Sequence, residues 1–230
     1  MSGILYGIGV GPGDPELITL KALRCIKECD IVILPSQPKE DCYSYQIVKQ
    51  VYPQVEEKEI MCMSFPMIKD KELLLRAHDE IYHKIASLLS MDKTVAFLVI
   101  GDPSIYSTYS YIHTRVLEQQ GNAFMISGIP SFCAAAAALG ISLGDNTDEI
   151  HIIPGSYDMK QTMKLKGTRV YMKSGKNLGE LKHVLSKSEE QNKPKVYAVS
   201  NCGMESEVIT VGLEHLNPES GYLTLVIVKE

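Results

Sequence analysis

The sequence has no apolar stretch approaching the roughly 20 residues that a membrane helix needs. It also has no block of basic residues, and its formal net charge is −5. These absences argue against a membrane partner and against a nucleic-acid partner. The first residues show no basic segment followed by an apolar one, so we expect no secretion signal.

Paired metal-ligand motifs are also absent. The six cysteines form no C-x-x-C pair, and no H-E-x-x-H occurs. The cysteines are scattered and several lie in apolar surroundings, so we expect reduced thiols and a cytoplasmic location rather than disulfides. Because the histidines lack ligand spacing, the sequence predicts no protein-bound metal.

Apolar runs alternate with helical patterns in the first half of the chain. We expect strands over 4–10, 30–34, 58–63 and 94–100, and helices over 15–28, 43–51 and 70–90. The last of these strands is almost wholly apolar, which is typical of a strand covered on both faces. The alternation predicts an α/β fold with a parallel sheet between helices.

The second half contains more strands and fewer helices. We expect strands over 123–127, 149–153, 168–172, 195–200, 207–211 and 222–228, and helices over 131–139 and 177–188. The short link before the last strand predicts a mixed sheet with an antiparallel edge. We therefore divide the chain into two α/β domains, 1–120 and 121–230.

A glycine loop follows the first strand, with glycine at every second position from Gly7 to Gly13. Bare backbone there lets a ligand approach closely. A dinucleotide fingerprint does not fit, because the third glycine position falls on Pro12, Asp14 or Glu16, according to where the motif is started. A P-loop does not fit either, since no Gly-Lys-Ser/Thr follows.

Asp14 is expected to cap the first helix, with Pro15 at its first position. Its carboxylate then occupies the helix N-terminus that a phosphate would need. The loop is therefore either a site for a ligand without phosphates or a tight β–α turn with no ligand.

Two further glycine turns follow later strands. Gly101 and Asp102 come directly after the apolar strand, where open α/β sheets bind ligands. Asp102 suits an amine or a ribose hydroxyl; the alternative is that it only caps the next helix. The third turn runs from Gly128 into an alanine-rich helix that starts at Ser131.

Together these motifs resemble the tetrapyrrole methylases, the class III S-adenosylmethionine (SAM) methyltransferases. The family's opening motif is matched by Gly7, Gly9, Gly11, Gly13, Asp14, Pro15, Leu17, Thr19 and Ala22. The GDP turn is matched by residues 101–103, and the third turn departs from the pattern only in having Ser127 where proline is usual.

The resemblance implies two α/β domains with an active-site cleft between them, a homodimer, and SAM as the methyl donor. The residues that it implies for SAM binding are Pro12, Gly101, Asp102, Ile105, Ser131, Met172, Ala198 and Thr224. It also assigns Tyr106 and Ser107 to the tetrapyrrole substrate.

Three segments resemble the subgroup that methylates carbon 20 of precorrin-2 or cobalt-factor II in cobalamin biosynthesis, a branch of porphyrin metabolism. They are residues 102–108, 202–204 and 222–225. Another tetrapyrrole methylase, such as one acting on uroporphyrinogen III, is the alternative. Outside the family, a nicotinamide-dependent oxidoreductase and a noncatalytic tetrapyrrole or cobalt carrier stay open.

The substrate of this subgroup carries many carboxylates, so cations are expected near it. Lys173, Lys176 and Arg115 are the candidates. The sequence identifies no catalytic base.

Overall fold

The computed structural model describes residues 2–36, 38–65, 70–187 and 194–230, and these form two compact units. The N-terminal unit ends at Pro130 and the C-terminal unit is Ser131–Glu230. The division thus falls later than the expected boundary between residues 120 and 121. The reason is that β5 (Asn122–Ile126) pairs with β1 (Ile4–Gly9) in the first sheet.

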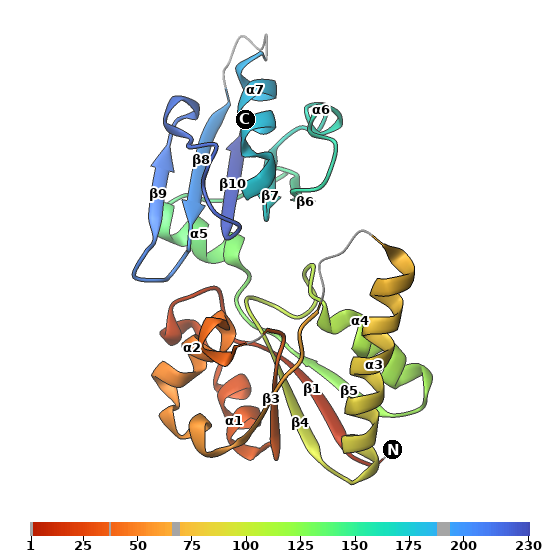
Figure 1. Ribbon diagram of the computed structural model, residues 1–230. Helices are drawn as coiled ribbons and strands as arrows, with labels where there is room; N and C mark the ends of the chain where they lie inside the picture. Colours follow the sequence, from red (N-terminus) through yellow and green to blue (C-terminus); the bar gives the residue numbers. More distant parts are fainter. Residues whose placement is uncertain (1, 37, 66–69, 188–193) are drawn as a thin grey trace. The chain divides into compact units, whose positions relative to one another are not determined.

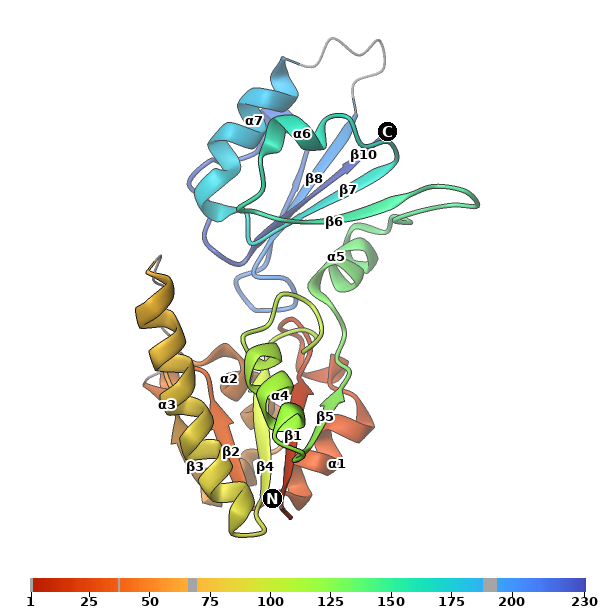
Figure 2. The same cartoon turned by 90° about the vertical axis from the view of Figure 1, so that its right-hand side faces the viewer.

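The N-terminal unit is built on a five-stranded parallel sheet with the order β3-β2-β4-β1-β5. Figure 1 labels its strands β1, β3, β4 and β5, and Figure 2 also labels β2. The other strands are β2 (Ile31–Leu34), β3 (Glu59–Cys62) and β4 (Thr94–Val99). Every pairing in this sheet is parallel. The parallel sheet expected from the β–α alternation is confirmed.

Helices cover both faces of this sheet (Figure 2). On one face α1 (Leu20–Glu28) and α2 (Tyr43–Val51) pack against the sheet, and on the other α3 (Lys71–Ser90) and α4 (Tyr109–Glu118) do so. Residues 95–98 of β4 are fully buried, which explains their apolar run.

The prediction of a single helix over 15–28 is wrong for its first turns. A short 3₁₀ helix, Pro15–Leu17, is capped by Asp14, and α1 begins only at Leu20. Ile18 between them has an extended backbone, and the Thr19 hydroxyl accepts a hydrogen bond of 3.1 Å from the Ala22 amide. Thr19 is therefore a second N-cap, which the stripe of apolar residues did not reveal.

The C-terminal unit contains a mixed sheet with the order β6-β7-β10-β8-β9. Its strands are β6 (Ile150–Pro154), β7 (Thr168–Met172), β8 (Lys195–Ser200), β9 (Val208–Val211) and β10 (Thr224–Lys229). Only β6 and β7 pair in parallel; β10 pairs antiparallel with β7 and β8, and β9 antiparallel with β8. The expected mixed sheet with an antiparallel edge is confirmed.

In the described part of this unit the α-helices are α5 (Ser131–Leu139), α6 (Met159–Thr162) and α7 (Leu178–Ser186). The four-residue α6 is too short for its periodicity to be read from the sequence. The helix expected over 177–188 ends at Ser186, and Ser188 lies outside the described residues. In the described ranges, no helix combines the length and apolar character needed to cross a bilayer.

Candidate active site

Three turns of the N-terminal unit meet where β1, β4 and β5 end. Because β1 lies between β4 and β5 and all three are parallel, their carboxyl ends share one edge of the sheet. Gly11 and Gly101 join the first two turns by a pair of backbone hydrogen bonds of 3.3 and 2.7 Å. This edge is where open α/β sheets bind ligands.

Several glycines of these turns are required by close packing of the backbone. A Cβ on Gly9 would lie 2.5 Å from the Gly101 carbonyl oxygen, and one on Gly128 would overlap that same oxygen. Glycine is required at Gly7 for a different reason, because a Cβ there would overlap the ring of the buried Tyr109. Gly7 therefore lets a side chain pack against β1 and is not part of a ligand-facing loop.

Gly101 differs from these glycines. Its φ is +73°, and a Cβ placed on it would meet nothing nearer than a carbonyl oxygen at 4.0 Å. Glycine is needed there for its backbone conformation, while the space beside it stays open. Pro12 is buried in the first turn, directly after Gly11.

Asp102 connects the second turn to the third. Its Oδ1 accepts hydrogen bonds from the Ser104 amide (2.8 Å) and the Ser104 hydroxyl (2.5 Å), and its Oδ2 accepts one from the Gly128 amide (3.1 Å). Asp102 is 9 % exposed. It does not cap α4, which begins only at Tyr109. A carboxylate offers about four acceptor sites, so capacity for a ligand donor remains.

The loop between Gly101 and α4 carries Ile105, which is expected for SAM, and Tyr106 and Ser107, which are expected for the substrate. Ile105 is half-buried and its amide donates to the Asp102 carbonyl (3.3 Å). Tyr106 is 43 % exposed, has φ +46°, and burial of part of its ring raises the pKa of its phenol. The Ser107 hydroxyl accepts a hydrogen bond from the Tyr109 amide (3.1 Å), so part of its capacity holds the start of α4.

Three of the expected residues of the C-terminal unit, Met172, Ala198 and Thr224, lie on β7, β8 and β10 toward one end of its sheet. Met172 is the last residue of β7 and Thr224 the first of β10. The Thr224 and Ser200 hydroxyls are 2.9 Å apart, and Ala198 lies two residues before Ser200 on β8. Met172, Ala198 and Thr224 are all at least nine-tenths buried.

Strand alternation divides these side chains between the two faces of the sheet. Ala198 packs in the core cluster under α7, and Thr224 shares that face by alternation with Val226 of the same cluster. Met172 alternates with Tyr171 of that cluster and so faces the other way. Ser131 does not belong to this sheet, because it is the first residue of α5.

Ser104 and Ser200 are partners that sequence reasoning missed. Ser104 binds Asp102 locally, and a serine two residues after an aspartate is a signal that could have been read. Ser200 meets Thr224 only through the antiparallel register of β8 and β10. That register follows from the tertiary fold and has no local signature.

The candidate cations have different surroundings. Arg115 forms an ion pair with Asp79, and its guanidinium lies over the Tyr82 ring at 5.0 Å, so it links α4 to α3. Lys173 follows β7 directly, and its ammonium lies over the Tyr222 ring at 5.8 Å. The side chain of Lys176 lies outside the described residues.

Cys202 belongs to a segment used to recognise the subgroup, and it is 5 % exposed. Burial, followed by the nearby Glu207 carboxylate, raises the pKa of its thiol to about 12. The thiol therefore stays protonated near neutral pH and does not act as a nucleophile there. An internal hydrogen bond stabilises the segment that contains Cys202, because the Gly203 amide donates to the Glu207 carboxylate at 2.7 Å.

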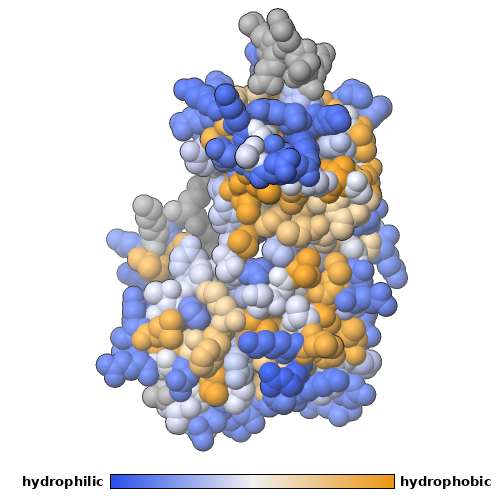
Figure 3. Space-filling view, turned by 180° about the vertical axis from the view of Figure 1, so that it is seen from behind, coloured by the Kyte–Doolittle hydropathy of each residue, from blue (hydrophilic) through white to orange (hydrophobic). Residues whose placement is uncertain are grey.

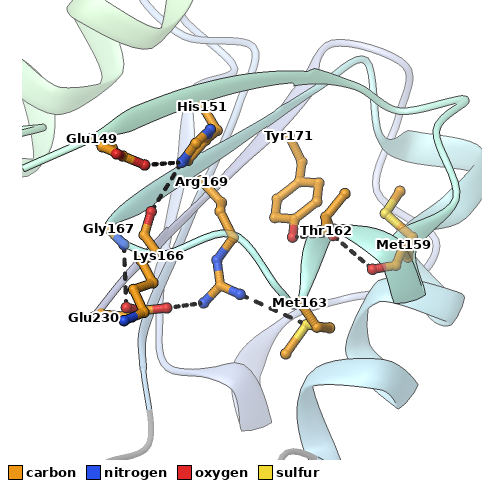
Figure 4. A network of polar contacts seen from close by, with 10 residues as sticks. All are labelled: Glu149, His151, Met159, Thr162, Met163, Lys166, Gly167, Arg169, Tyr171 and Glu230. Atoms are coloured by element: carbon orange, nitrogen blue, oxygen red, sulfur yellow. Dashed lines mark hydrogen bonds and ion pairs between the residues drawn. The ribbon is translucent and has the colours of Figure 1, made fainter.

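A polar network around Arg169 lies at the start of β7 (Figure 4). Arg169 is fully buried; its Nη2 lies 3.3 Å from the Glu230 carboxylate and its Nη1 contacts the Met163 sulfur at 3.9 Å. Its Nε has no hydrogen-bond partner among the described residues. This network joins β7 to β10 at the end of the sheet opposite to the residues expected for SAM.

Comparisons with known proteins agree with the motifs. The family model "Tetrapyrrole (Corrin/Porphyrin) Methylases" matches residues 4–216. A probable cobalt-precorrin-2 C(20)-methyltransferase of Methanocaldococcus jannaschii is 34 % identical, covering 98 % of this chain and 95 % of that protein. A precorrin-2 C(20)-methyltransferase of a Sinorhizobium species is 28 % identical, covering 99 % and 97 %.

Among solved structures, the fold is similar to a uroporphyrin-III C-methyltransferase from Thermus thermophilus complexed with S-adenosylhomocysteine. The TM-score is 0.72 at 20 % identity, covering 99 % of this chain and 98 % of that one. Both the expected fold class and the expected family are confirmed. The chain therefore belongs to the tetrapyrrole (corrin/porphyrin) methylases.

Proposed function

We propose that this chain transfers a methyl group from SAM to carbon 20 of precorrin-2 or cobalt-factor II, in cobalamin biosynthesis. The observation that carries the proposal is the nearly full-length match to two C(20)-methyltransferases. A match of both units is more specific than a shared glycine motif. The residues 102–108 and 202–204 add local support, because the subgroup resemblance rests on them.

The N-terminal turns suit a ligand without phosphates. Gly101 leaves open space beside a backbone of positive φ, and Asp102 offers further acceptor sites. Asp14 accepts the Glu16 amide at 2.8 Å, so a carboxylate occupies the position that a phosphate would need. We assign Pro12, Gly101, Asp102 and Ile105 to SAM, with Asp102 accepting from its ammonium or ribose.

In the C-terminal unit we assign Ser131, Met172, Ala198 and Thr224 to SAM. Met172 supplies a polarisable apolar side chain at a strand end, suited to an adenine ring. The side chains of Ala198 and Thr224 are small and are buried on the α7 face. We therefore propose that both residues contact SAM through their backbones. Ser131 offers a half-buried hydroxyl at the start of α5.

Tyr106 and Ser107 are assigned to the tetrapyrrole. The half-exposed phenol of Tyr106, with its raised pKa, can donate a hydrogen bond to a substrate carboxylate at neutral pH. Ser107 contributes less, since its hydroxyl already accepts the Tyr109 amide.

Bound SAM supplies a methyl group on a cationic sulfur, which an electron-rich macrocycle carbon can attack without a protein nucleophile. The residues of this chain then have to orient the two reactants and exclude water. Such positioning can contribute roughly 7–11 kcal/mol to lowering the barrier. No described residue is assigned as a base.

The test measures SAM binding and methylation separately. Calorimetry with S-adenosylhomocysteine should give saturable binding, and Asp102→Ala should weaken it. Anaerobic incubation with SAM and precorrin-2, cobalt-factor II or uroporphyrinogen III, each in a separate reaction, should add one methyl group to one of the first two. If Asp102→Ala leaves the affinity unchanged, the assignment of the cofactor is wrong. If only uroporphyrinogen III is methylated, the substrate belongs to the alternative tetrapyrrole methylase.

We further propose a homodimer in the cytoplasm. Figure 3 shows apolar residues on one face of the molecule. The edge strand β9 also exposes apolar side chains, because Val208, Ile209 and Val211 are 43–57 % exposed. An uncharged apolar edge strand favours burial against a partner. Light scattering should give twice the 25.5 kDa chain mass; a monomer would contradict the dimer. The free thiols of Cys25, Cys29, Cys42, Cys133 and Cys202 favour a reducing compartment.

A further inference from the structure

Six non-glycine residues among those described have a positive φ. Asp92, Asn146 and Asn201 are of the types that tolerate this conformation, and Gln120 closes the turn after α4. The remaining two are Tyr106 and Lys173, with φ of +46° and +55°. Both are large side chains in a conformation that favours glycine, and both follow the carboxyl end of a strand. Such outliers concentrate at functional sites.

The backbone of Lys173 is held in place by its neighbours. The Gly155 amide donates a 2.6 Å hydrogen bond to the Met172 carbonyl, and a Cβ on Gly155 would lie 2.5 Å from the Lys173 oxygen. The Asn177 side chain donates to the Gly155 carbonyl. Because these contacts fix the turn, the conformation of Lys173 is imposed by the fold, and a glycine there would satisfy it with less strain.

The Lys173 side chain is held by an aromatic ring. Its ammonium lies over the Tyr222 ring at 5.8 Å, within the range of a cation–π contact. Lys173 is exposed and Tyr222 is 46 % exposed, so the charge is accessible from solvent. A flexible lysine is thereby restricted to one region beyond the end of β7, next to Met172.

The neighbouring residue supplies an independent observation. Ser174 is fully buried and its hydroxyl has no hydrogen-bond partner in the described part of the chain. Its amide donates to the Thr224 carbonyl at 3.1 Å, which ties it to the strand end that carries Thr224. Buried polar groups are nearly always satisfied, so an unused hydroxyl indicates a place for a further polar partner.

We propose that Lys173 is a substrate-binding residue whose ammonium pairs with a carboxylate of the tetrapyrrole. The inference rests on the proposed function, because it takes the polycarboxylate macrocycle as the ligand. With a net charge of −5, the chain repels such a ligand unless cations are placed locally. SAM also has a carboxylate, so the test has to distinguish the two sources.

The experiment compares Lys173→Gly, Lys173→Asn and Lys173→Arg in the full chain. Glycine and asparagine both accept the positive φ, so these two variants should fold and melt at or above the wild-type temperature. Both should bind cobalt-factor II at least tenfold more weakly by absorbance titration, while the Kd of S-adenosylhomocysteine changes less than twofold. Lys173→Arg should recover most of the affinity.

Gln120→Gly is the matched control, because it relieves a φ of +55° in the turn after α4. It should change neither binding constant. The proposal is overturned if Lys173→Asn binds cobalt-factor II as tightly as the wild type. It is also overturned if the variants lose affinity only for S-adenosylhomocysteine, which would assign the cation to SAM, or if Lys173→Gly lowers the melting temperature and both affinities together.

The wild-type titration separates this inference from the proposed function. If the wild type binds cobalt-factor II but methylates neither it nor precorrin-2, the proposed reaction fails and the variants still test Lys173. If the wild type binds neither cobalt-factor II nor precorrin-2, both the reaction and the role of Lys173 are wrong. If it binds only precorrin-2, the same variants are titrated with that substrate.

Discussion

The Gly128 amide donates a 3.1 Å hydrogen bond to the Asp102 carboxylate and so joins the turn after β5 to the turn after β4. The other oxygen of the same carboxylate is held by Ser104. Asp102 therefore serves two purposes in the proposed site. It shapes the edge of the sheet, and it keeps acceptor capacity that we propose is used by the donor groups of SAM.

Replacing Asp102 with alanine should affect both properties. The buried Gly128 amide loses its acceptor, which costs about 1–3 kcal/mol of the free energy of unfolding. We expect the Kd for S-adenosylhomocysteine to rise at least tenfold, or about 1.4 kcal/mol. Urea unfolding measures the first effect and calorimetry the second. A variant with unchanged stability would contradict the bridging role.

Gly128→Ala should disrupt the junction of the three turns. The new Cβ would overlap the Gly101 carbonyl oxygen and approach Gly9, so backbone has to move. We expect a loss of stability of about 3 kcal/mol or more, with weaker binding of S-adenosylhomocysteine by the molecules that remain folded. The measurement is urea unfolding with and without the ligand.

Gly179→Ala is the control for the effect of adding a methyl group. Gly179 lies in α7, and a Cβ there meets only a side-chain carbon at 3.8 Å. It should be neutral or stabilise the C-terminal unit by up to about 1 kcal/mol. If both glycine variants behave alike, the close approach at Gly128 is not what selects glycine.

Much of the fold could be predicted from local patterns. The helices 43–51 and 131–139 and the strands 168–172 and 195–200 were placed with the bounds that the structure gives. Periodicity and flanking turn residues act within each segment, so one sequence suffices for them. The break at Ile18 and Thr19 was missed, because the apolar stripe runs through it and only the Thr19 cap interrupts it.

The site could be predicted only in part. The three glycine turns were located, because each follows a strand and leads toward a helix. The reasons why individual positions require glycine could not be predicted, since the close packing of the Tyr109 ring against Gly7 joins residues far apart in the chain. The same holds for Ser200 and Thr224, whose contact depends on the register of β8 and β10. Non-local packing decides these roles.

Glu230→Ala tests the buried Arg169 at the start of β7. The change leaves the fully buried Arg169 guanidinium without its carboxylate partner. The Glu230 side chain that supplies this carboxylate is 36 % exposed. Because that exposure weakens the pair, we expect a cost of about 1–3 kcal/mol in the free energy of unfolding, below the 3–5 kcal/mol of a wholly buried pair.

The double variant Arg169→Met with Glu230→Ala provides the control for this pair. It removes both charges and should recover most of the lost stability in urea unfolding. If the double variant is less stable than Glu230→Ala, the arginine stabilises the sheet by something other than its ion pair.

The lowered pKa values of two histidines predict that the protein loses stability in acid. Burial lowers the pKa of His78, with a contribution from Arg115, and burial also lowers the pKa of His113, both from the ordinary 6.5. Just below pH 6.5 the unfolded chain binds more protons than the folded one. Their contribution is therefore fully present above that pH and is lost as the pH falls, by at most about 1.4 kcal/mol per pH unit for each histidine.

Urea unfolding at pH 7.5 and pH 5.5 measures this effect. His78→Phe keeps an aromatic ring against Tyr111, which lies 4.8 Å away, and should make the stability fall less between the two values. His215→Gln is the control for loss of a histidine, since its side chain is 70 % exposed. An unchanged difference in His78→Phe would contradict the prediction.

The most direct measurement is an anaerobic incubation of the wild-type chain with SAM and either metal-free precorrin-2 or cobalt-factor II, followed by absorbance and mass. We predict one added methyl group on one of the two substrates, which also establishes whether the substrate contains cobalt. SAM binding without methylation of either substrate would contradict C(20)-methyl transfer, and uroporphyrinogen III would then be the first alternative substrate to examine.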